Sequence, residues 1–162
     1  DRPRAPVDLP VTLRKATPAD AEALAGIDTQ AGPNPSSSER FARISEAQGY
    51  RVLLLEEAGR ILAFAVLSTA ASDVTLQNIA VHVDRRRRGL GSRLLAAALE
   101  SARGEAELRC LLEVRRSNTG ARRLYAGAGF RVDGVRENYY PTQGGREDAL
   151  LMSLELQGIP ET

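Results

Sequence analysis

The order of hydrophobic and polar residues along the chain predicts alternating strands and helices. Runs rich in apolar and β-branched residues predict seven strands, at residues 11–16, 50–57, 60–69, 74–83, 108–115, 130–136 and 149–156. Apolar residues three and four positions apart predict helices at 38–48, 91–103 and 118–128, and a shorter helix that begins near Thr17 and carries Leu24 and Ile27. This order predicts an α/β fold with a mixed sheet and helices on both of its faces, and not a doubly wound parallel sheet.

Residues at the ends of these elements agree with the pattern. Thr17-Pro18 is typical of a helix start, because Thr17 can cap free N–H groups and Pro18 fits the first turn. Asn118 is the expected N-cap of the last helix. Ala58-Gly59 suits a hairpin turn between the strands on either side of it.

The length of the chain suits one domain. It has 162 residues, enough to bury a core without disulfides or metals. Residues 1–10 contain three prolines and no periodicity, so we expect a flexible N-terminal arm there. A single domain over residues 11–157 and a short tail at 158–162 should follow.

Composition and charge exclude several classes of function. The formal net charge is +1, so the overall charge selects neither nucleic acid nor a membrane surface as a partner. With one cysteine and one histidine, the chain cannot form an internal disulfide, and a His/Cys metal site is not expected. One cysteine and no signal-type segment favour a reducing, cytoplasmic setting. No apolar run approaches the ~20 residues that span a bilayer.

The clearest chemical signal is the segment Arg86-Arg87-Arg88-Gly89-Leu90-Gly91-Ser92, between a predicted strand and a predicted helix. Two glycines let the backbone turn tightly, and the free N–H groups of the following helix point back at the loop. Such a loop can bind a pyrophosphate, with arginines adding contacts. A simple turn with solvated arginines remains an equal alternative on loop chemistry alone. Binding of the arginines to the phosphates of a nucleic acid is less favoured, because no aromatic residues accompany them.

These residues also resemble a known family. Arg86-x-x-Gly89-x-Gly91, preceded by Asn78-Ile79-Ala80-Val81, is similar to the coenzyme A pyrophosphate signature of the GNAT acetyltransferases. Within that superfamily, the later part of the chain resembles the bacterial ribosomal-protein-alanine N-acetyltransferases, the RimI type. The motifs that carry this resemblance are Leu112-Glu113-Val114-Arg115, Ser117-Asn118, Leu124-Tyr125, Gly129-Phe130, Asn138-Tyr139-Tyr140-Pro141-Thr142 and Gly145-Arg146-Glu147-Asp148-Ala149. The resemblance covers residues 75–156, half of the chain.

The resemblance implies a fold and a cosubstrate. It implies a mostly antiparallel sheet of about seven strands flanked by four helices, and acetyl-CoA as acetyl donor with no metal. The backbone of Ile79, Ala80 and Val81 would then contact the pantetheine arm and the acetyl carbonyl, where an N–H can stabilise a developing oxyanion. The remaining cofactor contacts would come from Arg86, Arg87, Arg88, Gly89, Leu90, Gly91, Ser92 and Asn118.

The resemblance also assigns two catalytic roles. Glu113 matches the general base, which must take a proton from an amine that is largely protonated at neutral pH. Strand alternation puts Glu113 opposite apolar neighbours, and we expect an apolar setting to raise its pKa. The alternative is a surface glutamate paired with Arg115. Tyr125 matches the general acid that protonates the leaving thiolate, and its alternative is a core tyrosine with a bonded hydroxyl.

The acceptor side is less sharply defined. Tyr139 and Tyr140, expected in the connection between the last two strands, match residues that line the acceptor channel of the family. The family usually has aromatic residues where this chain has Gly32-Pro33-Asn34-Pro35-Ser36-Ser37, which concerns the identity of the acceptor. A protein N-terminus, most specifically the N-terminal alanine of a small-subunit ribosomal protein, is the leading acceptor. A small-molecule amine and a non-catalytic coenzyme A-binding module are the alternatives.

Two further residues carry potentially reactive side chains. Cys110 could carry an acyl group, but no histidine pairs with it in sequence and its face of the strand is expected to be core. His82 precedes the arginine run, and we expect it to be solvated or incidental to the chemistry.

Overall fold

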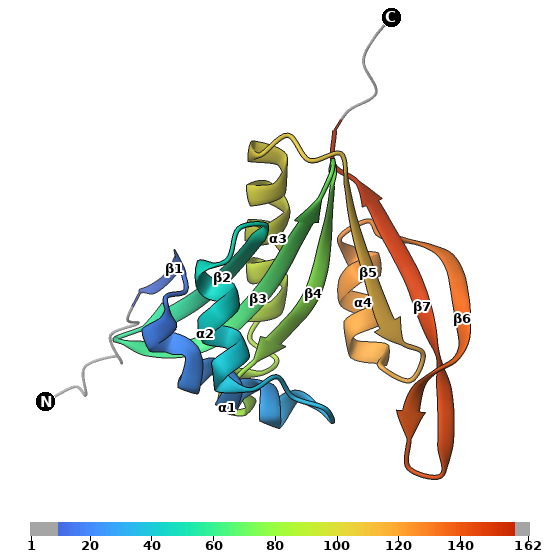
Figure 1. Ribbon diagram of the computed structural model, residues 1–162, viewed down its shortest axis with the longest axis horizontal. Coiled ribbons are helices and arrows are strands. Elements are labelled where there is room, and N and C mark those ends of the chain that lie inside the picture. Colours follow the sequence, from blue (N-terminus) through green and yellow to red (C-terminus); the bar gives the residue numbers. More distant parts are fainter. Residues whose placement is uncertain (1–9, 158–162) are drawn as a thin grey trace, which may run out of the picture.

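A computed structural model of the protein describes residues 10–157 (Figure 1). The predicted flexible arm, apart from Pro10, and the predicted tail lie outside these residues. The strands are β1 (Val11–Lys15), β2 (Tyr50–Glu57), β3 (Arg60–Ala70), β4 (Asp73–Val81), β5 (Arg109–Arg115), β6 (Arg131–Thr142) and β7 (Gly145–Glu155). The α-helices are α1 (Ala21–Ala31), α2 (Ser38–Glu46), α3 (Leu90–Gly104) and α4 (Thr119–Gly127). Short 3-10 turns at Pro18–Asp20 and Val83–Arg85 precede α1 and α3.

The seven strands form one sheet in the order β1-β2-β3-β4-β5-β7-β6. All neighbouring strands are antiparallel except β4 and β5, which are parallel. The predicted mixed, mostly antiparallel sheet with four helices is therefore confirmed. Within residues 10–157, no helix has both the length and the apolar character needed to cross a membrane.

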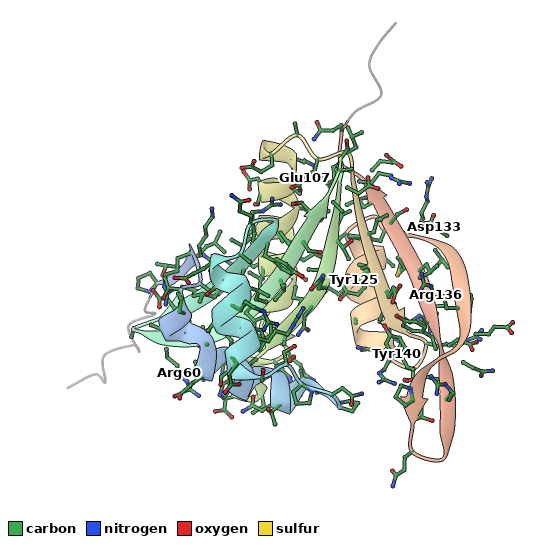
Figure 2. All side chains as sticks on the ribbon, viewed as in Figure 1. Arg60, Glu107, Tyr125, Asp133, Arg136 and Tyr140 are labelled. Atoms are coloured by element: carbon green, nitrogen blue, oxygen red, sulfur yellow. The ribbon has the colours of Figure 1, made fainter. Side chains whose placement is uncertain are left out.

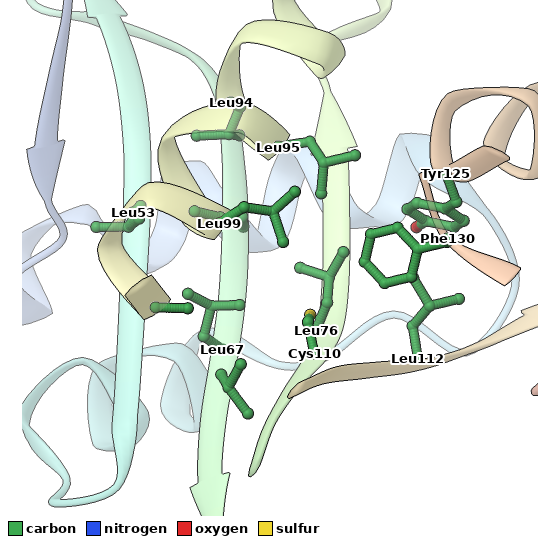
Figure 3. Packing of buried hydrophobic residues seen from close by; sticks show 14 of the residues in the cluster. Leu53, Leu67, Leu76, Leu94, Leu95, Leu99, Cys110, Leu112, Tyr125 and Phe130 are labelled. Atoms are coloured by element: carbon green, nitrogen blue, oxygen red, sulfur yellow. The ribbon is translucent and has the colours of Figure 1, made fainter. Parts of the chain in front are cut away.

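Helices cover the two faces of the sheet unequally. Helices α1 and α2 pack on one face over β2, β3 and β4, and α3 and α4 lie on the other face (Figure 1). Because both of its faces are covered, β3 is buried from Ile61 to Leu67. The core on the α3–α4 face includes Leu76, Leu94 and Leu99 (Figure 3). On the α1–α2 face, no helix covers β5, β7 and β6 within residues 10–157.

Strands β4 and β5 diverge from a short region of contact. They pair only where residues 73–75 of β4 meet residues 109–111 of β5. Beyond this point a bulge at Gln77 interrupts the pairing of β4 with β3, because Val66 faces Asn78 while Leu67 faces Leu76. A bulge bends its strand and increases the local twist. The lower parts of β4 and β5 in Figure 1 therefore run apart and leave one edge of β4 unpaired.

The sequence-based boundaries need one substantial correction. Strands predicted at 130–136 and 149–156 instead form a long hairpin, β6 and β7, joined through residues 143–144, where Gly144 has a φ of 94°. Tyr139 and Tyr140 consequently lie on strand β6 and not in a loop. Most of β6 is exposed, so it lacks the apolar alternation that reveals a strand in sequence. The predicted N-cap at Asn118 is confirmed, since its side chain accepts a hydrogen bond from the Ala121 N–H.

Candidate active site

The unpaired edge of β4 presents backbone groups to the opening between β4 and β5. The His82 N–H donates to the Leu62 carbonyl on β3 at 2.7 Å. Because N–H groups point alternately to the two sides of an antiparallel strand, those of Ile79 and Val81 point away from β3 and into the opening. The Ala80 N–H lies on the same side of β4 as that of His82 and points toward Phe64 on β3. Of the three residues expected to make backbone contacts with the cofactor, Ile79 and Val81 are those whose N–H groups face the opening.

The glycine loop has the backbone conformation that such a loop requires. Arg87 and Gly89 have positive φ angles of 65° and 74°, and Gly89 precedes the first residue of α3. The first turn of α3 leaves the N–H groups of Leu90, Gly91 and Ser92 without acceptors inside the helix. A left-handed turn followed by free N–H groups forms a concave site that suits a diphosphate.

The arginines of this loop have different surroundings. Arg86 donates to the backbone carbonyls of Val81 and Gln30, at 3.3 and 3.2 Å, so it joins the loop to β4 and α1. Arg86, Arg87 and Arg88 are all exposed, but within residues 10–157 the side chains of Arg87 and Arg88 make no hydrogen bond or ion pair. Arg87 and Arg88 can therefore reach a bound phosphate, whereas the hydrogen bonds of Arg86 attach the loop to β4 and α1.

Glu113 lies on the sheet face that α1 and α2 leave open. Its side chain is 33% exposed, and its Oε1 lies 3.6 Å from Nη1 of Arg136 on β6. The expected apolar setting is found only in part, because Leu111 and Leu151 line the cavity beside Glu113 while its carboxylate remains partly exposed and lies near Arg136. The alternative pairing with Arg115 is wrong, since Arg115 pairs with Glu147 at 3.0 Å.

Tyr125 lies on the opposite side of the sheet, in the core between α4 and β5. It is 7% exposed, and its ring centre lies 5.8 Å from that of Phe130 (Figure 3). Its hydroxyl makes no hydrogen bond to any residue in the range 10–157. The hydroxyl oxygen is not fully buried and keeps a small exposed area. The alternative of a core tyrosine with a hydrogen-bonded hydroxyl therefore agrees with the burial of the ring. It does not agree with the hydroxyl, which has no hydrogen-bond partner within residues 10–157. Burial raises the pKa of Tyr125 to about 12.

The two β6 tyrosines form a packed group with two arginines. The rings of Tyr139 and Tyr140 meet edge to face with centres 5.0 Å apart. Arg115 lies over the Tyr140 ring, with its Cζ 4.4 Å from the ring centre, and Arg136 lies over Tyr139 at 5.2 Å. Figure 2 labels Arg136 and Tyr140 on the β6–β7 side of the sheet, and Tyr125 nearer to β4 and β5. The aromatic–cation group therefore joins Glu113, through Arg136, to the end of β5.

A wide bulge in β6 presents these tyrosines. Arg136 faces Ala149 and Tyr140 faces Glu147, so three residues of β6 lie opposite one residue of β7. The Asp148 carboxylate accepts a hydrogen bond from the Asn138 N–H at 3.0 Å, and Arg146 donates to the Asn138 carbonyl at 2.8 Å. These side chains hold the bulge open.

Two adjoining cavities lie beside Tyr140, one of the residues predicted to line an acceptor channel. One of about 390 Å³ is lined by Asp28, Asn34, Arg40, Asn78, Arg115 and Asn118, among others. The other, of about 710 Å³, is lined by Glu113, Arg136, Leu111 and Leu151, among others. Gln77 and Tyr140 line both cavities. These two side chains therefore lie at the boundary between the cavities.

The remaining candidates have structural surroundings. Asn118 caps α4 and lines the smaller cavity, and it is not part of the glycine loop. Cys110 is buried, and burial raises the pKa of its thiol to about 11, so it remains a protonated thiol at neutral pH. The His82 Nδ1 accepts a hydrogen bond from the Asp84 N–H, so it caps a turn and is not simply solvated. Residues 10–157 contain no group of three or more His, Cys, Asp or Glu side chains that could hold a metal ion.

Sequence reasoning missed Asp28, Gln77 and Arg136 as members of this region. Asp28 and Asn78 meet across 50 residues of sequence, and the Gln77 bulge follows from strand register. No local pattern signals either feature. Arg136 could be found only by aligning β6 with β7, whose pairing the sequence did not reveal.

Comparison with known proteins identifies the family. Residues 21–130, more than half of the chain, match the Acetyltransferase (GNAT) family. The chain is 36% identical over 145 residues to the ribosomal protein bS18-alanine N-acetyltransferase of Escherichia coli K12, which covers 90% of this chain and 97% of that protein.

Solved structures agree with this match. The crystal structure of the ribosomal-protein-S18-alanine N-acetyltransferase from Escherichia coli superposes with a TM-score of 0.86 at 35% identity, over 93% of this chain and 97% of that one. A Salmonella typhimurium protein solved with its cofactor acetyl-CoA has a TM-score of 0.82 at 23% identity, over 93% and 96% of the two chains, and supports the fold alone. The glycine loop, the open edge of β4 and these similarities lead to one conclusion: the chain belongs to the GNAT acetyltransferase family.

Proposed function

We propose that this protein transfers the acetyl group of acetyl-CoA to an α-amino group, and that its acceptor is the N-terminal alanine of a small-subunit ribosomal protein. The observation that carries the proposal is the opening between β4 and β5. Glu113 lies on the acceptor side of this opening and Tyr125 on the other side. The relatives named for bS18 alanine acetylation match nearly the whole chain. A ribosomal acceptor would place the enzyme in the cytoplasm.

The donor end of the site fits a long ligand with a diphosphate. The free N–H groups at the start of α3 and the exposed Arg87 and Arg88 favour a diphosphate at the glycine loop. From there, the unpaired edge of β4 leads toward Glu113. An N–H of Ile79 or Val81 can donate to the acetyl oxygen as negative charge develops there. Acetyl-CoA supplies the activated acetyl group.

In this proposal, Glu113 acts as the general base. A free α-amino group has a pKa near ~8, so it arrives largely as an ammonium and must lose a proton before its nitrogen bonds to the acetyl carbon. The partly exposed Glu113 carboxylate can take this proton directly or through a water molecule. Arg136 and the cavity around it leave the carboxylate accessible from the acceptor side.

Tyr125 acts as the general acid. When the carbon–sulfur bond breaks, the sulfur leaves as a thiolate that needs a proton. The phenol of Tyr125 remains protonated at neutral pH because burial raises its pKa to about 12. Its hydroxyl makes no hydrogen bond within residues 10–157, so its proton is free for the thiolate. The ammonium thus gives one proton to Glu113 before attack, and the nitrogen loses a second proton to water once its bond to the acetyl carbon has formed. Tyr125 gives its proton to the sulfur as the carbon–sulfur bond breaks, and regains one from solvent.

A second acceptor class is motivated by the loop between α1 and α2. Residues 32–35 are all exposed and include no aromatic side chain, so the loop leaves the smaller cavity open at one side. A small free amine, such as a polyamine, could enter there without a peptide chain attached.

A competition experiment tests the acceptor. The protein is incubated with acetyl-CoA, peptides that differ only in their first residue, and free polyamines, and products are identified by mass spectrometry. We expect acetylation of the α-amino group of the alanine peptide, located by fragmentation, at a kcat/KM well above that of any free amine. A higher kcat/KM for the free amines would replace the ribosomal acceptor by the small-molecule one.

A further inference from the structure

Asp28 on α1 is a buried carboxylate with unusual surroundings. Among residues 10–157 three acidic side chains are buried, namely Asp20, Asp28 and Glu107. Asp20 pairs with Arg14 at 2.8 Å and Glu107 with Arg51 at 2.7 Å. Asp28 is 8% exposed, and within residues 10–157 no basic side chain lies within 4.0 Å of its carboxylate. Burying a charge without a counter-charge is costly, so the two hydrogen bonds that Asp28 accepts must compensate for its desolvation.

These two hydrogen bonds reach two different walls of the acceptor cavity. Asp28 Oδ2 accepts from the Ser36 N–H at 2.7 Å, and Oδ1 accepts from Nδ2 of Asn78 at 2.7 Å. Ser36 belongs to the loop between α1 and α2, and Asn78 belongs to β4. Asp28 itself lines the cavity together with both of them. One side chain therefore connects the loop, the cavity and the strand.

The loop depends on this connection because little else holds it. Residues 32–35 are exposed and Ser36 is half-buried, so no side chain of this stretch anchors it in the core. Within residues 10–157, residues 33–36 make a single hydrogen bond to residues outside this stretch, from the Ser36 N–H to Asp28. The loop has no aromatic residue to bury, and a single charge-assisted hydrogen bond holds it in place.

The other hydrogen bond holds the strand that faces the reacting groups. Asn78 directly follows the Gln77 bulge and directly precedes Ile79, whose N–H points into the opening. A displacement of Asn78 would therefore move the nearest backbone donor on β4. Small errors in the position of such a donor reduce its effect on the rate.

We infer that Asp28 is a positioning residue. Its two hydrogen bonds fix the loop between α1 and α2 and the β4 backbone in one geometry. The inference rests on the proposed acetyl transfer. It assigns no proton transfer to Asp28. Replacement of Asp28 should weaken acceptor binding through the loop between α1 and α2, and should slow turnover through β4. The affinity of the glycine loop for the diphosphate of coenzyme A should not change.

Three variants test this role. Asp28→Ala removes both hydrogen bonds, and we expect a rise in acceptor KM and a fall in kcat of about tenfold each, as typical for a lost charge-assisted hydrogen bond. Asp28→Asn can retain both bonds, because its oxygen accepts from Ser36 and its NH₂ can donate to an Asn78 amide that has turned over. We expect it to remain within about threefold of wild type. Asp20→Ala, another buried aspartate beside the same helix but outside the cavity, is the matched control.

Hydrogen exchange gives a readout that does not depend on activity. The Ser36 amide should exchange faster in Asp28→Ala and remain protected in Asp28→Asn, with the Kd of acetyl-CoA unchanged in both. The inference is overturned if Asp28→Ala keeps wild-type KM, kcat and Ser36 protection, or if Asp20→Ala changes the acceptor KM equally. Loss of all activity in Asp28→Asn with retained protection would show that the charge itself acts. If the alanine peptide is no substrate for wild type, the proposed acceptor fails, while the exchange measurement still tests Asp28.

Discussion

The Arg115 guanidinium packs over the Tyr140 ring, 4.4 Å from its centre, while it donates to the Glu147 carboxylate at 3.0 Å. Arg115 ends β5, Tyr140 lies on β6 and Glu147 on β7. One side chain thus holds the β6–β7 hairpin against the end of β5, and both Arg115 and Tyr140 line the smaller acceptor cavity. The wall of that cavity is therefore fixed by a cation–aromatic contact and an ion pair that share one guanidinium.

Loss of this contact should weaken acceptor binding. Arg115→Gln removes both interactions, and we expect the acceptor KM to rise by about 5- to 30-fold, equivalent to roughly 1–2 kcal/mol. The Kd of acetyl-CoA should stay within about twofold, because the glycine loop is untouched. Arg131→Gln is the control, since Arg131 is 67% exposed and lies outside both acceptor cavities. Steady-state kinetics with varied peptide distinguishes the two, and equal KM values for them would contradict the role of Arg115.

Gly89 should be needed for cofactor affinity. Its φ of 74° costs a non-glycine residue about 1–2 kcal/mol, and relief of that strain would move the loop away from its binding conformation. We expect Gly89→Ala to raise the Kd of coenzyme A by about tenfold in calorimetry. Gly59, with a φ of 80° in the β2–β3 turn, is a matched control with similar strain. If Gly59→Ala weakens coenzyme A binding as much, the effect reflects general destabilisation.

Direct transfer predicts that Cys110 carries no acetyl group. The thiol is buried and its raised pKa of about 11 keeps it protonated. Cys110→Ala should retain kcat within about twofold and lose only about 1–2 kcal/mol of unfolding free energy to the cavity it leaves. Intact-mass measurement of wild type with acetyl-CoA and no acceptor should show no added acetyl group. An adduct on Cys110, together with an inactive variant, would replace direct transfer by a two-step route.

Asp20 should stabilise the fold in a pH-dependent way. Its hydrogen bonds with Arg14 lower the pKa of Asp20 to about 2. A lowered pKa stabilises the folded state above the ordinary pKa of an aspartate, near ~4, and this contribution is lost as the pH falls toward 2. We expect Asp20→Asn to cost about 1–2 kcal/mol at pH 7, less than the full shift because Arg14 is 35% exposed. Urea unfolding at several pH values should show this cost shrinking below pH 4, and a constant cost would contradict the assignment.

Local rules were sufficient to predict much of this molecule from its sequence. The Asn118 cap and the Ala58-Gly59 turn depend on the chemistry of adjacent residues, and both are found. The glycine loop is likewise a local signal. Its position between β4 and α3 agrees with the prediction, because strand and helix periodicities on either side are strong.

The features that were missed depend on residues far apart in sequence. The setting of Glu113 follows from Arg136, and their proximity depends on the register of β5, β7 and β6. The length of β6 could not be inferred, because an exposed strand with two bulges has no clear alternation of polar and apolar residues. The divergence of β4 and β5 depends on a bulge that no residue type announces.

We propose that Glu113 and Tyr125 act as general base and general acid on the two sides of the β4–β5 opening. Single-turnover acetyl transfer to an alanine-starting peptide, measured by rapid quench with enzyme in excess and both substrates saturating, tests it most directly in wild type, Glu113→Gln and Tyr125→Phe. We predict rate constants about 100-fold or more below wild type in each variant, with the Kd of acetyl-CoA unchanged. Wild-type rate constants in both variants would contradict the account.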